Sequence, residues 1–142
     1  MKKILVATDA SEYSKRAFRS ALELARLYKA EVELLFVIYD PVVYSIGVAA
    51  NYIAPPEQLD RDGELVLDAT LEGIDTNGVT LVKKKLHGNP GNVIIQEVIN
   101  EDIDLVVMGS HGYGAIASTL LGSVSQKVLH GAKCSVLIVR EK

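Results

Sequence analysis

Short runs of Ile, Leu and Val alternate along this chain with segments of helical periodicity, and this alternation limits the possible folds more than any other feature. The first unit pairs an apolar run at residues 3–8 with a helical pattern at 11–28. Further strands are expected at 32–38, 79–86, 104–108 and 135–139, and further helices at 57–75, 90–100 and 123–131. Such alternation predicts an α/β fold: a doubly wound, five-stranded parallel sheet with four helices in three layers, α/β/α.

The length and composition of the chain suit one compact unit. The chain has 142 residues, of which 49% are hydrophobic, and this is enough to form a substantial core. No internal repeat, low-complexity tract or linker divides the sequence. We therefore expect a single domain over residues 1–142.

Charge and cysteine content exclude several classes of function. The net charge of −3 provides no basic field for nucleic acid, and the basic run Lys83-Lys84-Lys85 is expected to form a solvated strand edge. The single cysteine, Cys134, excludes an intrachain disulfide and is typical of a reducing cytosol. No segment has the ~20 consecutive apolar residues of a membrane helix. A soluble, cytoplasmic protein without a nucleic-acid or membrane partner is expected.

A glycine-rich segment provides the main functional signal. The predicted strand at 104–108 is followed by Gly109 and Gly112, and Gly122 precedes a predicted helix that begins with Ser123 and includes Ser125. Glycines allow close approach of the backbone to a ligand, and a helix N-terminus offers free N–H groups and a positive dipole end. This pattern indicates a phosphate site. The simpler alternative is a glycine turn followed by a serine cap.

The spacing Gly109-x2-Gly112-x9-Gly122-Ser123 resembles the nucleotide-binding signature of the ATP-binding branch of the universal stress protein family. Segments 4–14, 35–38, 88–90 and 134–140 also follow the family's order, so the resemblance covers the whole chain. Ala10 and Ser135 depart from the glycine and proline that are frequent in the family, at positions that supply no ligand side chain. The resemblance implies the strand order 3-2-1-4-5, whereas periodicity alone also allows the flavodoxin-like order 2-1-3-4-5. In either order the ends of the first and fourth strands border a crevice.

The resemblance also implies a ligand and a set of site residues. The ligand would be ATP, or ADP or AMP, carried with Mg²⁺ or Mn²⁺. Backbone near the adenine and ribose would come from Ala7 and Thr8, and apolar walls from Val37 and Met108. The full predicted set is Ala7, Thr8, Asp9, Val37, Met108, Gly109, His111, Gly112, Gly122, Ser123, Val124 and Ser125.

Two side chains in this set allow more than one interpretation. Asp9 either caps the first helix in a capping box with Glu12, or accepts hydrogen bonds from ribose hydroxyls and helps to hold Mg²⁺. His111 is the histidine of the glycine motif, but no acid–base partner lies near it in sequence. A loop histidine that hydrogen-bonds a ligand, or that is simply exposed, is favoured over a catalytic one.

The sequence favours binding over catalysis. Residues 109–126 contain no Lys or Arg, and the chain has no Gly-x4-Gly-Lys-Ser/Thr motif to neutralise a transferring phosphoryl group. We therefore expect a nucleotide-dependent sensor or switch in a stress response, without catalytic residues. The alternatives are a slow ATP hydrolase or phosphotransferase at the same site, and a dimeric scaffold that binds no nucleotide. A receiver domain is disfavoured because residues 86–90 contain no acceptor aspartate.

Two segments point to partners. In the family's strand order, the last strand is an edge strand that includes Val136 to Val139, without proline or central charge, so a homodimer through this edge is expected. Residues 41–56 carry no charge and include several apolar side chains. They are expected to cover the crevice or to contact another subunit.

Overall fold

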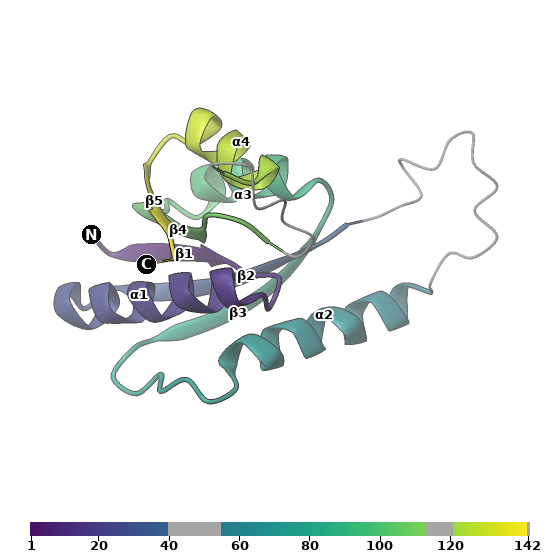
Figure 1. Cartoon of the computed structure of the whole chain (residues 1–142), viewed down its shortest axis with the longest axis horizontal. Helices are drawn as coiled ribbons and strands as arrows, with labels where there is room; N and C mark the ends of the chain where they lie inside the picture. The colour runs from purple at the N-terminus through teal and green to yellow at the C-terminus, as the bar shows by residue number, and fades with distance from the viewer. Residues whose placement is uncertain (40–54, 113–120, 142) are drawn as a thin grey trace.

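The computed structural model describes residues 1–39, 55–112 and 121–141 (Figure 1). The uncharged segment at 41–56 therefore lies almost wholly outside the described residues, and the prediction of a lid or partner contact stays untested. The described elements, in chain order, are β1 (Lys3–Ala7), α1 (Glu12–Tyr28), β2 (Glu31–Ile38), α2 (Pro56–Leu71), β3 (Leu81–His87), α3 (Pro90–Asn100), β4 (Leu105–Gly109), α4 (Ser123–Gly131) and β5 (Ser135–Val139).

The strands form one parallel sheet in the order β3-β2-β1-β4-β5. This confirms the predicted fold class and strand order and rules out the flavodoxin-like order. In the register, Val6 of β1 lies between Leu34 of β2 and Val107 of β4. The winding reverses between β1 and β4, so the carboxyl ends of these two strands border the point where ligands bind in doubly wound sheets.

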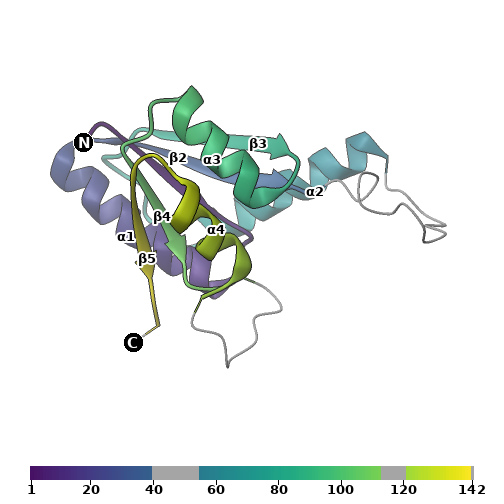
Figure 2. The same cartoon turned by 90° about the horizontal axis from the view of Figure 1, so that it is seen from above.

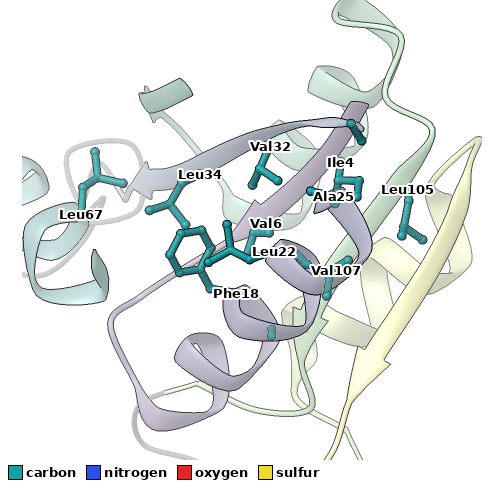
Figure 3. Close-up of a cluster of buried hydrophobic side chains, with 13 residues drawn as sticks. Ile4, Val6, Phe18, Leu22, Ala25, Val32, Leu34, Leu67, Leu105 and Val107 are labelled. Atoms are coloured by element: carbon teal, nitrogen blue, oxygen red, sulfur yellow. The ribbon is translucent and has the colours of Figure 1, made fainter. Parts of the chain in front are cut away.

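Helices cover both faces of the sheet. In Figures 1 and 2, α1 and α2 lie against one face, and α3 and α4 lie together against the other. Alternate residues of a strand point to opposite faces, and accordingly Ile4 and Val6 join the α1 side whereas Leu5 joins the α3 side. Figure 3 shows Phe18 of α1 and Leu67 of α2 within the first of these apolar clusters. None of the described helices combines the length and apolar character required to cross a bilayer.

Two details of the helix ends differ from the sequence prediction. Ser11, not Asp9, is the N-cap of α1, and its side chain accepts a hydrogen bond from the backbone N–H of Ser14. The capping-box interpretation of Asp9 is therefore wrong, which leaves its carboxylate in the loop after β1. Helix α2 ends at Leu71 instead of continuing to residue 75, because Gly73 adopts a left-handed conformation (φ 72°) that interrupts the helix.

The lysine run lies on the edge strand β3, as expected, but its three side chains are paired with carboxylates. Lys83 and Lys85 reach Glu64 of α2 on one face of the sheet. Lys84 points to the other face, where it forms ion pairs with Glu97 and Glu101 of α3. The strand alternation thus divides one basic run between two acidic helices.

A buried acidic pair lies beside Lys84. Glu33 of β2 and Glu97 of α3 are 6% and 4% exposed, and the Oε1 atom of Glu33 has no hydrogen-bond partner among the described residues. Burial raises the pKa of Glu33 from 4.5 to about 7, and the negative charge of Glu97 adds to this effect. The positive charge of Lys84 lowers the pKa of Glu33 and partly offsets this increase. Glu33 therefore keeps its proton up to about neutral pH.

Candidate functional site

A cavity of about 580 Å³ opens at the carboxyl ends of β1 and β4. Its walls come from the loop after β1, from β2, from the glycine segment after β4 and from the start of α4. The residues predicted from the sequence all line this cavity, namely Ala7, Thr8, Asp9, Val37, Met108, Gly109, His111, Gly112, Gly122, Ser123, Val124 and Ser125. Segments about a hundred residues apart in sequence therefore meet at one place.

Several lining residues were not predicted from the sequence. They are mainly apolar side chains of the core or of helix ends, and the full group is Ser14, Leu35, Phe36, Pro90, Ile94, Leu121 and Gln126. Apolar residues inside strand and helix patterns carry no signal that distinguishes a cavity wall from ordinary core. Ser14 is different, because its place three residues after the cap residue Ser11 puts it on the first turn of α1, beside the loop that follows β1.

The carboxylate of Asp9 is held by its own loop. Its Oδ1 atom accepts hydrogen bonds from the Ser11 backbone N–H at 2.9 Å and from the Ser14 hydroxyl at 3.2 Å. The Oδ2 atom lies on the side of Gly112, close to where a side chain at that position would begin. Asp9 thus has a fixed orientation, with its carboxylate directly beside the glycine loop.

Two glycines of the motif lie very close to neighbouring residues of the β1–α1 corner. A Cβ atom at Gly109 would lie 2.7 Å from the backbone carbon of Tyr13, at the start of α1. A Cβ atom at Gly112 would collide with Asp9 Oδ2. Real Cβ atoms do not come so near. At Gly109 the neighbour is backbone, so no larger residue fits between β4 and the start of α1, whereas at Gly112 a larger residue would force the Asp9 carboxylate to turn away.

The N-terminus of α4 faces the cavity. Gly122 is its N-cap, without a side-chain cap, and the Gly122 N–H donates to the Ser110 carbonyl at 2.7 Å. The first turn of a helix leaves N–H groups without intrahelical partners and carries the positive end of the dipole. Ser123 is exposed at this turn, whereas the Ser125 hydroxyl donates to the Gly109 carbonyl at 2.9 Å. Ser125 therefore ties α4 to the end of β4.

His111 is oriented by its neighbours. Its Nδ1 atom lies 3.0 Å from the Ser110 hydroxyl, and its ring packs at 5.5 Å from the ring of Tyr13. These contacts hold the imidazole in the lining of the cavity, where it can hydrogen-bond a ligand.

The cavity offers neutral donors and one carboxylate. No Lys or Arg is among the lining residues in the part of the chain that the structure describes. Within the same ranges, no group of three or more His, Cys, Asp or Glu side chains is arranged to hold a metal ion. An anionic ligand would therefore be bound by backbone amides, hydroxyls and a helix dipole, and a divalent cation would need further oxygen ligands from the bound molecule or from water.

Comparison with known proteins supports the fold and identifies the family. The model of the universal stress protein family matches residues 1–140. A universal stress protein of Thermus aquaticus is 38% identical over 140 residues, and the match covers 98% of each chain. The solved universal stress protein UspA of Lactobacillus plantarum shares the fold, with a TM-score of 0.78 and 24% identity over 98% of this chain and 97% of that one.

A solved universal stress protein family member from Arabidopsis thaliana, with AMP bound, has a TM-score of 0.67. It is 26% identical, over 100% of this chain and 93% of that chain. The family model and the Thermus relative both match nearly the full length of this chain. The chain therefore belongs to the universal stress protein family.

Proposed function

We propose that this protein binds an adenine nucleotide, ATP or alternatively ADP or AMP, in the cavity between β1 and β4. The observation that carries the proposal is the convergence of the twelve predicted site residues on one cavity of about 580 Å³, which is large enough for a nucleotide. The AMP bound to the Arabidopsis relative supports the same ligand class.

The cavity lining provides two kinds of surface that match a nucleotide. Val37, Met108 and Ile94 supply apolar surface for the adenine ring. The glycine loop and the first turn of α4 supply N–H donors and the Ser123 hydroxyl for phosphates. Asp9 also lines the cavity, and its carboxylate can accept hydrogen bonds from ribose hydroxyls.

A divalent cation fits this site only together with a nucleotide. Asp9 is an oxygen ligand of the type that Mg²⁺ or Mn²⁺ prefers, and its Oδ2 atom faces the glycine loop. Since the described residues provide no cluster of three or more acidic or histidine ligands, phosphate oxygens and water would complete the coordination. The metal would reduce the repulsion between the Asp9 carboxylate and the phosphates.

The bound nucleotide acts as a signal that changes the shape or the partners of the protein during stress. Rapid phosphoryl transfer needs cationic groups that neutralise developing charge, and the described lining residues include no Lys or Arg. This supports a sensor or switch over a hydrolase or phosphotransferase.

The test is calorimetric titration of nucleotide-stripped protein with ATP and Mg²⁺. We expect saturable binding at one site per chain. Gly122→Val should abolish it, because branched methyl groups at this N-cap would extend toward His111 and Ser110, whose nearest atoms lie 3.4 Å and 3.5 Å from a Cβ there. Glu23→Ala, on the exposed side of α1, is the matched control and should bind normally. A folded wild-type protein that takes up no nucleotide would refute the proposal.

The proposed working form is a cytoplasmic homodimer of single universal stress protein domains, each spanning residues 1–142. Strand β5 supports this form, because it is an edge of the sheet and Leu137 on it is 38% exposed. Light scattering at micromolar concentration should give twice the mass of one chain, and Leu137→Lys should reduce it to that of one chain. A monomeric wild-type protein would contradict this proposal.

A further inference from the structure

A chain of buried hydroxyl groups connects α2 with the nucleotide cavity. The Thr70 hydroxyl of α2 lies 2.7 Å from the Thr8 hydroxyl, and the Thr8 hydroxyl lies 3.1 Å from that of Ser14. The Ser14 hydroxyl in turn donates to Asp9 Oδ1 at 3.2 Å. Thr70, Thr8 and Ser14 are 0%, 6% and 4% exposed. Thr70 is closed off from solvent, whereas Thr8 and Ser14 expose little area but border the cavity. Such low exposure strengthens hydrogen bonds.

The hydrogens of this chain can be arranged in more than one way. Each hydroxyl has a single hydrogen, and the Thr70 hydroxyl is within reach of both Thr8 and the Val66 carbonyl, at 2.8 Å. If Thr70 donates to Thr8, then Thr8 can donate to Ser14. The Ser14 hydrogen then points either to the Ser11 carbonyl at 2.9 Å or to Asp9 Oδ1 at 3.2 Å, and in the second case three dipoles point at the carboxylate. If Thr70 donates to Val66, then Thr8 can donate to Thr70, and Ser14 accepts from the Ser11 hydroxyl at 3.4 Å instead of from Thr8.

The Thr70 hydroxyl makes one contact within its own helix and one outside it. A buried threonine within a helix can satisfy its hydroxyl with the carbonyl four residues earlier, as Thr70 does with Val66. The contact with Thr8 is additional, and it joins α2 to the loop after β1. The other buried residues of α2 are Gly63 and Leu67, which carry no side-chain polar group. Thr70 does not line the cavity, so it cannot touch a ligand there.

We propose that Thr70 is a positioning residue that couples α2 to the nucleotide site through Thr8, Ser14 and the carboxylate of Asp9. This inference rests on the proposed nucleotide binding and adds a route by which the bound state is transmitted. Binding at Asp9 favours one direction of the hydroxyl chain, and that direction determines how firmly α2 is held at Thr70. By linkage, α2 influences nucleotide affinity to the same extent.

The first test compares two substitutions at Thr70 by titration with ATP and Mg²⁺. Thr70→Val preserves the volume and removes the hydroxyl, so it should weaken binding about three- to tenfold, as expected for one buried hydrogen bond. Thr70→Ser preserves the hydroxyl and removes a methyl group, so it should lower stability while retaining wild-type affinity. Leu67→Val, one turn away on α2, is the control for loss of packing and should also bind as the wild type does.

A second measurement detects the coupling itself. In the wild-type protein, saturating ATP should slow amide hydrogen exchange in α2, and Thr70→Val should reduce that slowing. In an Asp9→Asn background, Thr70→Val should have a smaller effect on affinity than in the wild type, because the neutral amide oxygen at the end of the chain is a weaker acceptor than the carboxylate. A role of Thr70 in stability alone would change the melting temperature without either of these effects.

The outcomes separate the two proposals. If the folded wild-type protein binds no nucleotide, both the proposed function and the role of Thr70 are refuted. If the wild type binds ATP but Thr70→Val has the same affinity and the same protection of α2, only the coupling is refuted. Equal weakening by Thr70→Val, Thr70→Ser and Leu67→Val would also refute it, because packing would then explain the effect.

Discussion

Glutamine at position 33 would preserve the shape of a buried carboxyl side chain and remove its charge at every pH. Glu33 is 6% exposed, and burial followed by repulsion from Glu97 raises its pKa to about 7. Lys84 lowers this value and Glu101 raises it slightly. In the Glu33→Gln variant, the side-chain amide can donate to the Glu97 carboxylate whatever the pH. The wild-type side chain can do so only while it is protonated.

The magnitude follows from the two pKa values. An ordinary glutamate has a pKa of 4.5 and Glu33 in the folded protein one of about 7, and each pKa unit corresponds to about 1.4 kcal/mol. Between these values the folded state holds a proton that the unfolded state has lost, so the Glu33 contribution to stability falls as pH rises. Well below pH 4.5 the Glu33 contribution to the free energy of unfolding is fully present. Above pH 7 it has been lost, which lowers the free energy of unfolding by roughly 3 kcal/mol.

The assay is thermal unfolding of the wild type and of Glu33→Gln at several values between pH 4.5 and 8.5. As pH rises, the melting temperature of the variant should increase relative to that of the wild type. The relative increase should reach about 10 °C at pH 8.5 for a chain of this size. Glu64, Glu101 and Asp104 have lowered pKa values and produce the opposite trend. Because both proteins contain them, the difference between the two melting temperatures isolates Glu33.

Glu31→Gln places a glutamine two residues earlier in β2, at a partly exposed position, and serves as the matched control. A gap between Glu33→Gln and the wild type that stays the same at every pH would refute the reasoning. So would a wild-type protein that becomes more stable than the variant as pH rises, because a buried carboxyl with a raised pKa cannot produce that result.

Three further predictions concern the site and its supporting loop. Gly112→Ala should weaken ATP binding at least tenfold by titration, because the new methyl group collides with Asp9 Oδ2; unchanged affinity would contradict the described geometry. Ser11→Ala should lower the free energy of unfolding by about 1 kcal/mol in urea, since it removes the N-cap of α1; an unchanged midpoint would show that the cap contributes nothing. Steady-state ATP hydrolysis should stay below about 1 per second, and faster ADP release that disappears with Gly122→Val would favour a hydrolase.

Much of the fold was predictable because the apolar pattern is strong. The runs in β1, β2 and β4 read as strands buried on both faces, and all three are largely buried in the sheet. Helix ends were less certain, since they depend on single residues. Asp9 and Ser11 are both good caps in sequence, and only the backbone conformation at Ser11 shows which of them performs the role.

The candidate site was predictable to the extent that its residues belong to a local motif. Glycines, serines and an aspartate at characteristic spacing are visible in the sequence, and the structure places all of them on one cavity. Ile94 and Leu35 were not predicted as lining residues, because a leucine or isoleucine that borders a cavity has the same periodicity as one that fills the core.

The sequence by itself determined the alternation of strands and helices, the two-sided burial of the central strands and the composition of the glycine loop, since these depend on residues close together in the chain. Tertiary structure alone decided which distant groups meet. Thr70 and Thr8 are separated by 62 positions and share a buried hydrogen bond. Glu33 and Glu97 share a buried site although nothing local marks either as unusual. The pKa of Glu33 and the link from α2 to Asp9 arise from the packing of helices on the sheet, because only packing excludes water from these groups and brings them within bonding distance.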